Sequence, residues 1–423
     1  MRFRGLPAPA PARGPRRGLE SSVLILVTLG LVAFGLVMVY SATSASAALA
    51  NGDPAYYLKR QAVYACLGLA VMVFLARVDF HRLRSLAPTL IVTSIGLLLA
   101  VLVLGRAANG ARRWISIGPA AFQPSELAKL TLAVWAASCL ARRRAPRTLG
   151  ELWRPIGVVT LVFCGLILVE PDLGTAIAIV AMLAAILLVS GTPTRTLAGG
   201  LGIAATLGLF AVWFEPYRRA RLFSFLNPWQ DAQGAGFQTV QAMIGLGSGS
   251  IFGVGLGQSV QKVNYLPEAH TDMIFAIIGE ELGLVGATAV IAAYCAFAYA
   301  GLKIALDCKD PFGKRLAAGL TALVCGQAAI NLAAVMGLAP LTGIPLPFVS
   351  YGGSSLVVGL ACVGILLNIA ANAGARSASV PDRSRWDSGA RAASARRRRR
   401  PASARSTGDV RRVAGSRRGA ARP

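Results

Sequence analysis

The sequence predicts an all-α integral membrane protein with about ten transmembrane helices, on three observations. The chain of 423 residues is 55% hydrophobic and only 14% charged, which is a membrane composition. Apolar runs of roughly 17–25 residues recur along it, the length that a helix needs to cross a bilayer. Basic residues gather in alternate connections between these runs, as expected of cytoplasmic loops.

The apolar runs give the predicted spans in order. They lie at roughly 22–41, 58–76, 86–105, 124–141, 155–170, 174–191, 197–214, 272–302, 316–338 and 349–372. With ten spans, both termini and most basic residues are expected in the cytoplasm. The first run could instead be a secretory signal, but its apolar stretch at 23–39 is longer than the usual core of about 7–15 residues.

Composition divides the chain into three parts. Residues 1–20 form a basic cytoplasmic N-terminus, 21–373 a membrane domain, and 374–423 an Arg-rich cytoplasmic tail. The tail has too little apolar surface to fold alone, so we expect it to be disordered. Two roles stay open for it: a solvated segment that touches anionic lipid headgroups, or a binding segment for a cytoplasmic partner. We expect no nucleic-acid partner.

Two connections on the expected outer face stand out. The larger, about 215–270, lies between spans seven and eight, and such a long loop is usually functional. The other, 106–123, carries Arg112 and Arg113. Basic residues are disfavoured on this side, and an anionic ligand is one reason for their presence.

The segment 245–257 is rich in glycine but matches neither a P-loop nor a dinucleotide-binding fingerprint. It predicts close backbone packing or a re-entrant turn. The alternative is that its backbone N–H groups lie near an anionic lipid headgroup.

Asp272 opens the eighth span and is the main candidate for chemistry. Ionisable groups at membrane depth are costly and usually mark function. The structural alternative is an acid that complements the helix dipole from the first turn. On a helix, Glu280 lies about 80° and Glu281 about 180° round from Asp272, so Glu280, not Glu281, could line the same cavity. Because Glu280 would lie roughly 12 Å deeper, one acid acting as a base fits better than a dyad.

Other polar residues have structural explanations. Glu126 lies near a helix start and can pair with Lys129, while Asp172 is expected to cap a helix. The small residues of 345–355 favour close helix packing. Neither histidine, nor any of the seven cysteines, shows the spacing of a metal site or a disulfide.

Several motifs, in order along about 20–372, resemble the SEDS family of bacterial cell-wall proteins (FtsW, RodA and SpoVE). They are Arg112-Arg113-Trp114-Ile115, Gln123-Pro124-Ser125-Glu126, Glu170-Pro171-Asp172-Leu173-Gly174-Thr175, Asn227-Pro228-Trp229, Gly253-Val254-Gly255-Leu256-Gly257, Tyr265 through Asp272, and Pro345 through Ser355. The stretch 258–272 looks more like the division branch, FtsW, than the elongation branch, RodA. Asn264 and Met273 depart from the usual family pattern, which has an acid and Phe there.

The resemblance implies a peptidoglycan glycosyltransferase that polymerises lipid II on the outer face of the cytoplasmic membrane, at the division septum. The family's essential acid falls on Asp272, the expected general base. The expected substrate-binding residues are Arg112, Arg113, Trp114, Glu126, Lys262, Glu268, His270 and Ser350. The Arg218–Arg221 group could also supply positive charge at the leaving diphosphate, and a divalent cation, Mg²⁺ or Mn²⁺, could share that work. The expected partners are lipid II, a class B penicillin-binding protein transpeptidase and other divisome membrane proteins.

Two other functions remain open: a lipid II flippase, and a non-enzymatic scaffold that recruits a transpeptidase. A flippase should line a path across the membrane with polar groups, whereas here they gather in the 106–126 and 215–272 regions. A scaffold would leave Asp272 dispensable.

Overall fold

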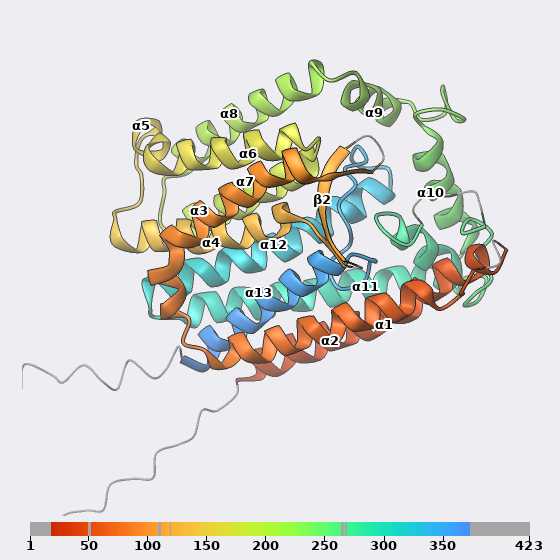
Figure 1. Cartoon of the computed structure of the whole chain (residues 1–423), viewed down its shortest axis with the longest axis horizontal. Coiled ribbons are helices and arrows are strands. Elements are labelled where there is room, and N and C mark those ends of the chain that lie inside the picture. The colour runs from red at the N-terminus through yellow and green to blue at the C-terminus, as the bar shows by residue number, and fades with distance from the viewer. Residues whose placement is uncertain are drawn as a thin grey trace, which may run out of the picture. The chain divides into compact units, whose positions relative to one another are not determined.

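A computed structural model of the chain describes residues 18–49, 52–108, 111–118, 120–263, 266 and 269–372 (Figure 1). The expectations for the Arg-rich tail, for most of the basic N-terminus and for Glu268 fall outside the described residues.

Each of the ten predicted spans is a helix. They are α1 (Leu19–Leu49), α2 (Tyr56–Arg77), α3 (His81–Leu104), α4 (Pro124–Arg142), α6 (Val158–Val169), α7 (Leu173–Val189), α8 (Thr194–Trp213), α11 (Ile274–Asp307), α12 (Pro311–Val335) and α13 (Gly353–Asn372). Within the described chain, eight helical stretches are long and apolar enough to cross a membrane, and α7 is apolar but shorter. One of the eight, Leu149–Val169, comprises α5 (Leu149–Leu152), the π-helical turn η1 (Trp153–Gly157) and α6. The prediction of a helical, multi-pass membrane protein is confirmed.

The two connections that the sequence analysis expects on the outer face hold structure that the sequence did not predict. Strands β1 (Arg106–Ala108), β2 (Ala111–Ile117) and β3 (Ala120–Phe122) form an antiparallel sheet in the order β1-β2-β3. Helices α9 (Pro216–Leu226) and α10 (Phe237–Ser248) lie in the long connection. The sheet, α9 and α10 gather at one end of the long helices, together with the 337–352 loop (Figure 1). We call this the sheet end.

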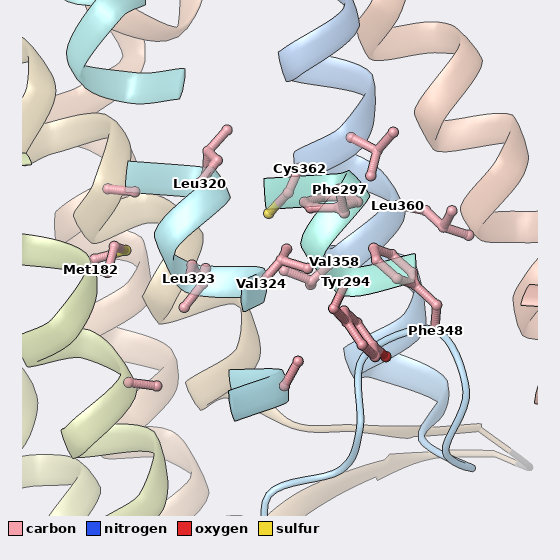
Figure 2. Close-up of a cluster of buried hydrophobic side chains, with 14 of the residues drawn as sticks. Met182, Tyr294, Phe297, Leu320, Leu323, Val324, Phe348, Val358, Leu360 and Cys362 are labelled. Carbon is pink, nitrogen blue, oxygen red and sulfur yellow. The ribbon is translucent and has the colours of Figure 1, made fainter. Parts of the chain in front are cut away.

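Helix α12 lies at the centre of the core, in contact with α4, α7, α11 and α13. Figure 2 shows Met182 of α7, Phe297 of α11, Leu320 of α12 and Val358 of α13 meeting there, with Phe348 from the 337–352 loop.

Helices α2 and α13 pack very closely because glycines line their contact. A Cβ at Gly353 would lie 2.5 Å from the Tyr64 ring, and one at Gly364 would lie 2.5 Å from the Met72 carbonyl oxygen. The expected close packing of the small residues is confirmed for this helix pair.

Helix α11 is broken at Gly283, where φ is +66°. Residues 284–307 are long enough to cross a bilayer on their own, whereas 274–281 are buried throughout. The glycine-rich segment supplies hydrogen-bond partners at the break. The N–H groups of Val254 and Gly255 donate to the carbonyls of Glu280 and Glu281, each at 3.0 Å. The predicted close backbone packing of that segment is confirmed, and these two N–H groups are not available to a lipid headgroup.

Replacing Gly283 by Ala should lower the free energy of unfolding by at least about 2 kcal/mol, because a positive φ is costly for a residue with a Cβ. That Cβ would also lie 2.5 Å from the Ile251 carbonyl oxygen. Thermal unfolding in detergent measures the effect. Gly30→Ala in α1 is the control, since a Cβ there meets nothing within 4 Å. Equal melting of the two variants would contradict the requirement for this break.

Candidate functional site

Asp272 lies at the sheet end, one residue before the N-cap Met273 of α11. The predicted span therefore begins two residues later than expected, and Asp272 lies outside its first turn. Its half-buried carboxylate accepts a hydrogen bond from the Thr271 hydroxyl at 3.2 Å. Its backbone carbonyl accepts one from Asn331 Nδ2 of α12 at 2.7 Å, and the same amide donates to the Ile344 carbonyl at 2.8 Å. Asn331 thus holds Asp272 beside the 337–352 loop.

The break in α11 explains how Asp272 reaches this position. Asn331 lies 20 residues after the start of α12, or about 30 Å along its axis. A straight α11 would place Ile274 about 50 Å from Asp307, which adjoins the start of α12. The part of α11 before Gly283 must therefore turn away from the axis of the rest to bring Asp272 beside Asn331.

His270 and Ser350 both lie near Asp272, but they differ in their surroundings. The His270 ring packs against Tyr57 and Tyr351, with centroids 4.6 and 5.4 Å away. Ser350 is buried, and its hydroxyl accepts a hydrogen bond from the Leu346 N–H at 2.8 Å. Ser350 thus stabilises the loop turn, and its substrate-binding role stays a prediction.

Three half-buried arginines, which we call the arginine cluster, donate to backbone carbonyls. Arg113 Nε donates to the Glu170 carbonyl at 2.7 Å, and its Nη2 donates to the Pro171 carbonyl. Arg218 Nη2 donates to the Leu168 carbonyl at 2.6 Å and its Nη1 to the Ala211 carbonyl at 3.2 Å.

The third member is Arg221, whose Nη1 donates to the Leu341 carbonyl at 3.2 Å. Within the described ranges none of the three forms a salt bridge. Their positive charges are therefore held in place by uncharged acceptors, an arrangement that suits an anionic ligand.

Asp272 and the arginine cluster flank the short segment 341–344. A Cβ at Gly343 would lie 3.9 Å from Asp272 Oδ2, and one at Gly174 would lie 2.6 Å from Ile344. Gly174 is in the first turn of α7, directly after the turn whose carbonyls bind Arg113. The structure thus brings a carboxylate and three guanidinium groups from three separate parts of the chain to the segments 168–174 and 341–344.

An apolar cavity of about 840 Å³ lies between α6, α7 and α8, and one end of its lining lies next to this site. Leu168, Leu173 and Val212 line it at the sheet end, and Trp153 and Leu197 at the other. Its position could not be predicted from the sequence.

Lys262 is placed differently from the prediction. Its ammonium group forms an ion pair with Glu281 Oε1 at 2.9 Å, and the two side chains are 3% and 0% exposed. The Ser41 hydroxyl of α1 completes the cluster at 2.8 and 2.7 Å from the Glu281 oxygens. Since Lys262 is buried and paired, the structure supports a role in holding the loop rather than contact with substrate.

Glu280 also differs from the expectation. Its carboxylate accepts hydrogen bonds from the Ser259 hydroxyl and from the Val260 N–H at 3.0 Å. The prediction from the angles around a helix was wrong, because the loop before Asp272 folds onto the face of α11 that carries Glu280. Glu280 therefore does not share a cavity with Asp272.

Glu126 lies in the core rather than at the site. It pairs with Lys129 at 2.9 Å, and both side chains are buried where α4 meets α12 and α13. The predicted pair is confirmed, and its burial argues against the substrate-binding role. Asp172 is the N-cap of α7, since it accepts from the Thr175 N–H at 3.0 Å, which confirms that prediction too.

The remaining predicted site residues lie on β2, where Arg112 is exposed and Trp114 is half-buried. Among the described residues, no group of three or more His, Cys, Asp or Glu side chains is placed to hold a metal ion. We therefore derive no step through a metal.

Sequence reasoning missed Asn331 and the buried side chain of Glu170. Asn331 carried a usable signal, because an amide within an apolar span is a candidate for a specific hydrogen bond. Glu170 gave none beyond its place in a turn.

Comparison with known proteins agrees with this arrangement. The family model for the cell cycle proteins FtsW, RodA and SpoVE matches residues 21–374. The probable peptidoglycan glycosyltransferase FtsW of Geobacter metallireducens is 40% identical over 350 residues, covering 82% of this chain and 93% of that protein. Stage V sporulation protein E of Bacillus subtilis is 39% identical over 355 residues, covering 82% and 96%.

Two solved structures share the fold. One is a chain in a structure that describes how a peptidoglycan synthase complex coordinates polymerization and crosslinking. It has a TM-score of 0.70, is 33% identical, and the match covers 83% of this chain and 97% of that one. The other is the rod shape determining protein RodA of Thermus thermophilus, with a TM-score of 0.61, 31% identity and coverage of 83% and 96%. The chain belongs to the FtsW, RodA and SpoVE family of cell cycle proteins.

Proposed function

We propose that this protein is a peptidoglycan glycosyltransferase that polymerises lipid II, with Asp272 as the general base. One observation carries the proposal: the Asp272 carboxylate and the arginine cluster flank the same segment, 341–344. Lipid II joins a sugar to a diphosphate, and its polymerisation needs both kinds of group.

The chemistry follows from this placement. The acceptor sugar hydroxyl attacks the anomeric carbon of the donor, and the bond from that carbon to the diphosphate oxygen breaks. Asp272 takes the hydroxyl proton as the new glycosidic bond forms. The electron pair of the broken bond leaves with the diphosphate, whose developing charge is stabilised by Arg113, Arg218 and Arg221.

The apolar cavity supplies a place for the polyprenyl chain. Arg218 binds the carbonyls of Leu168 and Ala211, which are at or next to positions that line the cavity. A diphosphate on the arginine cluster would therefore leave its lipid chain at the cavity mouth. Burial of apolar chain against this lining favours binding.

The proposed orientation places the sheet end on the outer face of the cytoplasmic membrane and both termini inside. Arg147 and Arg195 lie by the opposite ends of the helices, where the positive-inside rule expects basic residues. We further propose action at the division septum with a class B penicillin-binding protein and other divisome membrane proteins. The similarity to a chain of a peptidoglycan synthase complex supports a transpeptidase partner.

Purified protein in proteoliposomes tests the proposal, with lipid II as substrate and with or without a class B penicillin-binding protein. We expect glycan strands, seen by gel electrophoresis. Movement of fluorescent lipid II between leaflets without glycan would instead indicate a flippase. The apolar lining of the cavity disfavours that outcome, because a polar headgroup would have to cross it.

A further inference from the structure

Glu170 is a buried acid that the proposed mechanism does not use. It lies in the turn between α6 and α7, and its side chain is 1% exposed. Both carboxylate oxygens are buried, and neither has a hydrogen-bond partner among the residues that the structure describes. A carboxylate in this position is costly when charged, because no donor replaces the water it loses.

The neighbours of Glu170 do not relieve this cost. Arg113 of β2 binds the backbone carbonyl of Glu170, not its carboxylate. Asp172, two residues on, is a second negative group, and its oxygens already accept from Thr175 and Gln123. Arg218 of α9 donates to the Leu168 carbonyl in the last turn of α6, not to the Glu170 carboxylate.

These surroundings raise the pKa of Glu170 to about 8, through burial first and the Asp172 charge second, against an opposing effect of Arg113. Glu170 is therefore protonated at neutral pH and ionises as the pH rises through about 8. The three arginines of the cluster, with Asp172 and with Glu215 whose charge acts on Arg218, carry one net positive charge while Glu170 is neutral, and none once it is ionised.

We infer that Glu170 sets the charge of the arginine cluster and thereby its affinity for the diphosphate of a polyprenyl ligand. While Glu170 is neutral, the site keeps one net positive charge beside the cavity, and this charge attracts an anion. The ionised form of Glu170 cancels that charge. The inference rests on the proposed function, since it assigns a regulatory group to the same site.

The test is equilibrium binding of undecaprenyl diphosphate to the full chain in detergent between pH 7 and 9.5. We expect wild-type affinity to fall about three- to tenfold across this range, since the site loses one unit charge near the ligand. Glu170→Gln, a neutral isostere, should bind undecaprenyl diphosphate at pH 7 like the wild type. Its affinity should then stay constant as the pH rises. Glu170→Met serves as a second neutral variant should the first fold poorly, and Glu151→Gln at the opposite end is the control.

Undecaprenol, which lacks the diphosphate, should show no pH dependence in any variant. The inference is overturned if Glu170→Gln keeps the full fall in affinity, or if it already binds weakly at pH 7. Glycan synthesis, measured on the same preparations, separates this outcome from failure of the proposed function. If glycan is made but affinity does not depend on pH, only the role of Glu170 is rejected. If affinity depends on pH but no glycan is made, only the polymerase function is rejected.

Discussion

Replacing Asp272 by Asn should lower lipid II polymerisation at least about 100-fold, because the amide cannot accept the proton of the acceptor hydroxyl. Asn has nearly the same shape, and Asp272 is held through its backbone carbonyl by Asn331. We therefore expect an unchanged melting temperature and undecaprenyl diphosphate binding within about threefold of wild type. Glycan synthesis, thermal unfolding and ligand binding, measured on one preparation, check the three expectations.

Two further variants sharpen this test. Asp272→Glu keeps the carboxylate but moves it by one methylene, so it should retain more activity than Asp272→Asn. Asp307→Asn, at the far end of α11, removes an exposed acid and should leave synthesis unchanged. Near-wild-type synthesis by Asp272→Asn would exclude Asp272 as the base and would favour the scaffold hypothesis.

Replacing Lys262 by Met should cost about 3–5 kcal/mol of folding free energy, because Glu281 would remain as a buried charge without its partner. The double variant Lys262→Met with Glu281→Gln should recover much of this loss, since the Gln is neutral and can still bind the Ser41 hydroxyl. Thermal unfolding in detergent measures both.

The matched control is Lys59→Met. It breaks a pair of similar length, Lys59 with Asp53 at 2.7 Å, but those side chains are 70% and 47% exposed. We expect a change within about 0.5 kcal/mol, because water screens an exposed pair. If Lys262→Met instead melts normally and only weakens ligand binding, Lys262 contacts the substrate after all and the loop-holding role is wrong.

The sequence by itself determined the ten helices and several local interactions. A bilayer demands about 20 consecutive apolar residues for each crossing, so each span is encoded within its own segment. The Glu126–Lys129 pair and the Asp172 cap were also predictable, because both depend on spacings of three residues along one helix or its first turn. The position of Asp272 near the start of a span was predictable for the same reason, since it follows from the local sequence.

Only the tertiary structure decided which partners the polar groups of the site bind. Lys262 pairs with Glu281 of α11 across a chain separation of 19 residues, and the backbone of 250–255 supplies hydrogen-bond partners at the break in α11 at Gly283. The guanidinium groups of the arginine cluster bind carbonyls from segments as much as 120 residues away, which no local spacing encodes. Glu170 is buried without a donor for the same reason. Burial and hydrogen bonding are properties of what surrounds a group in space, and these surroundings come from distant parts of the chain.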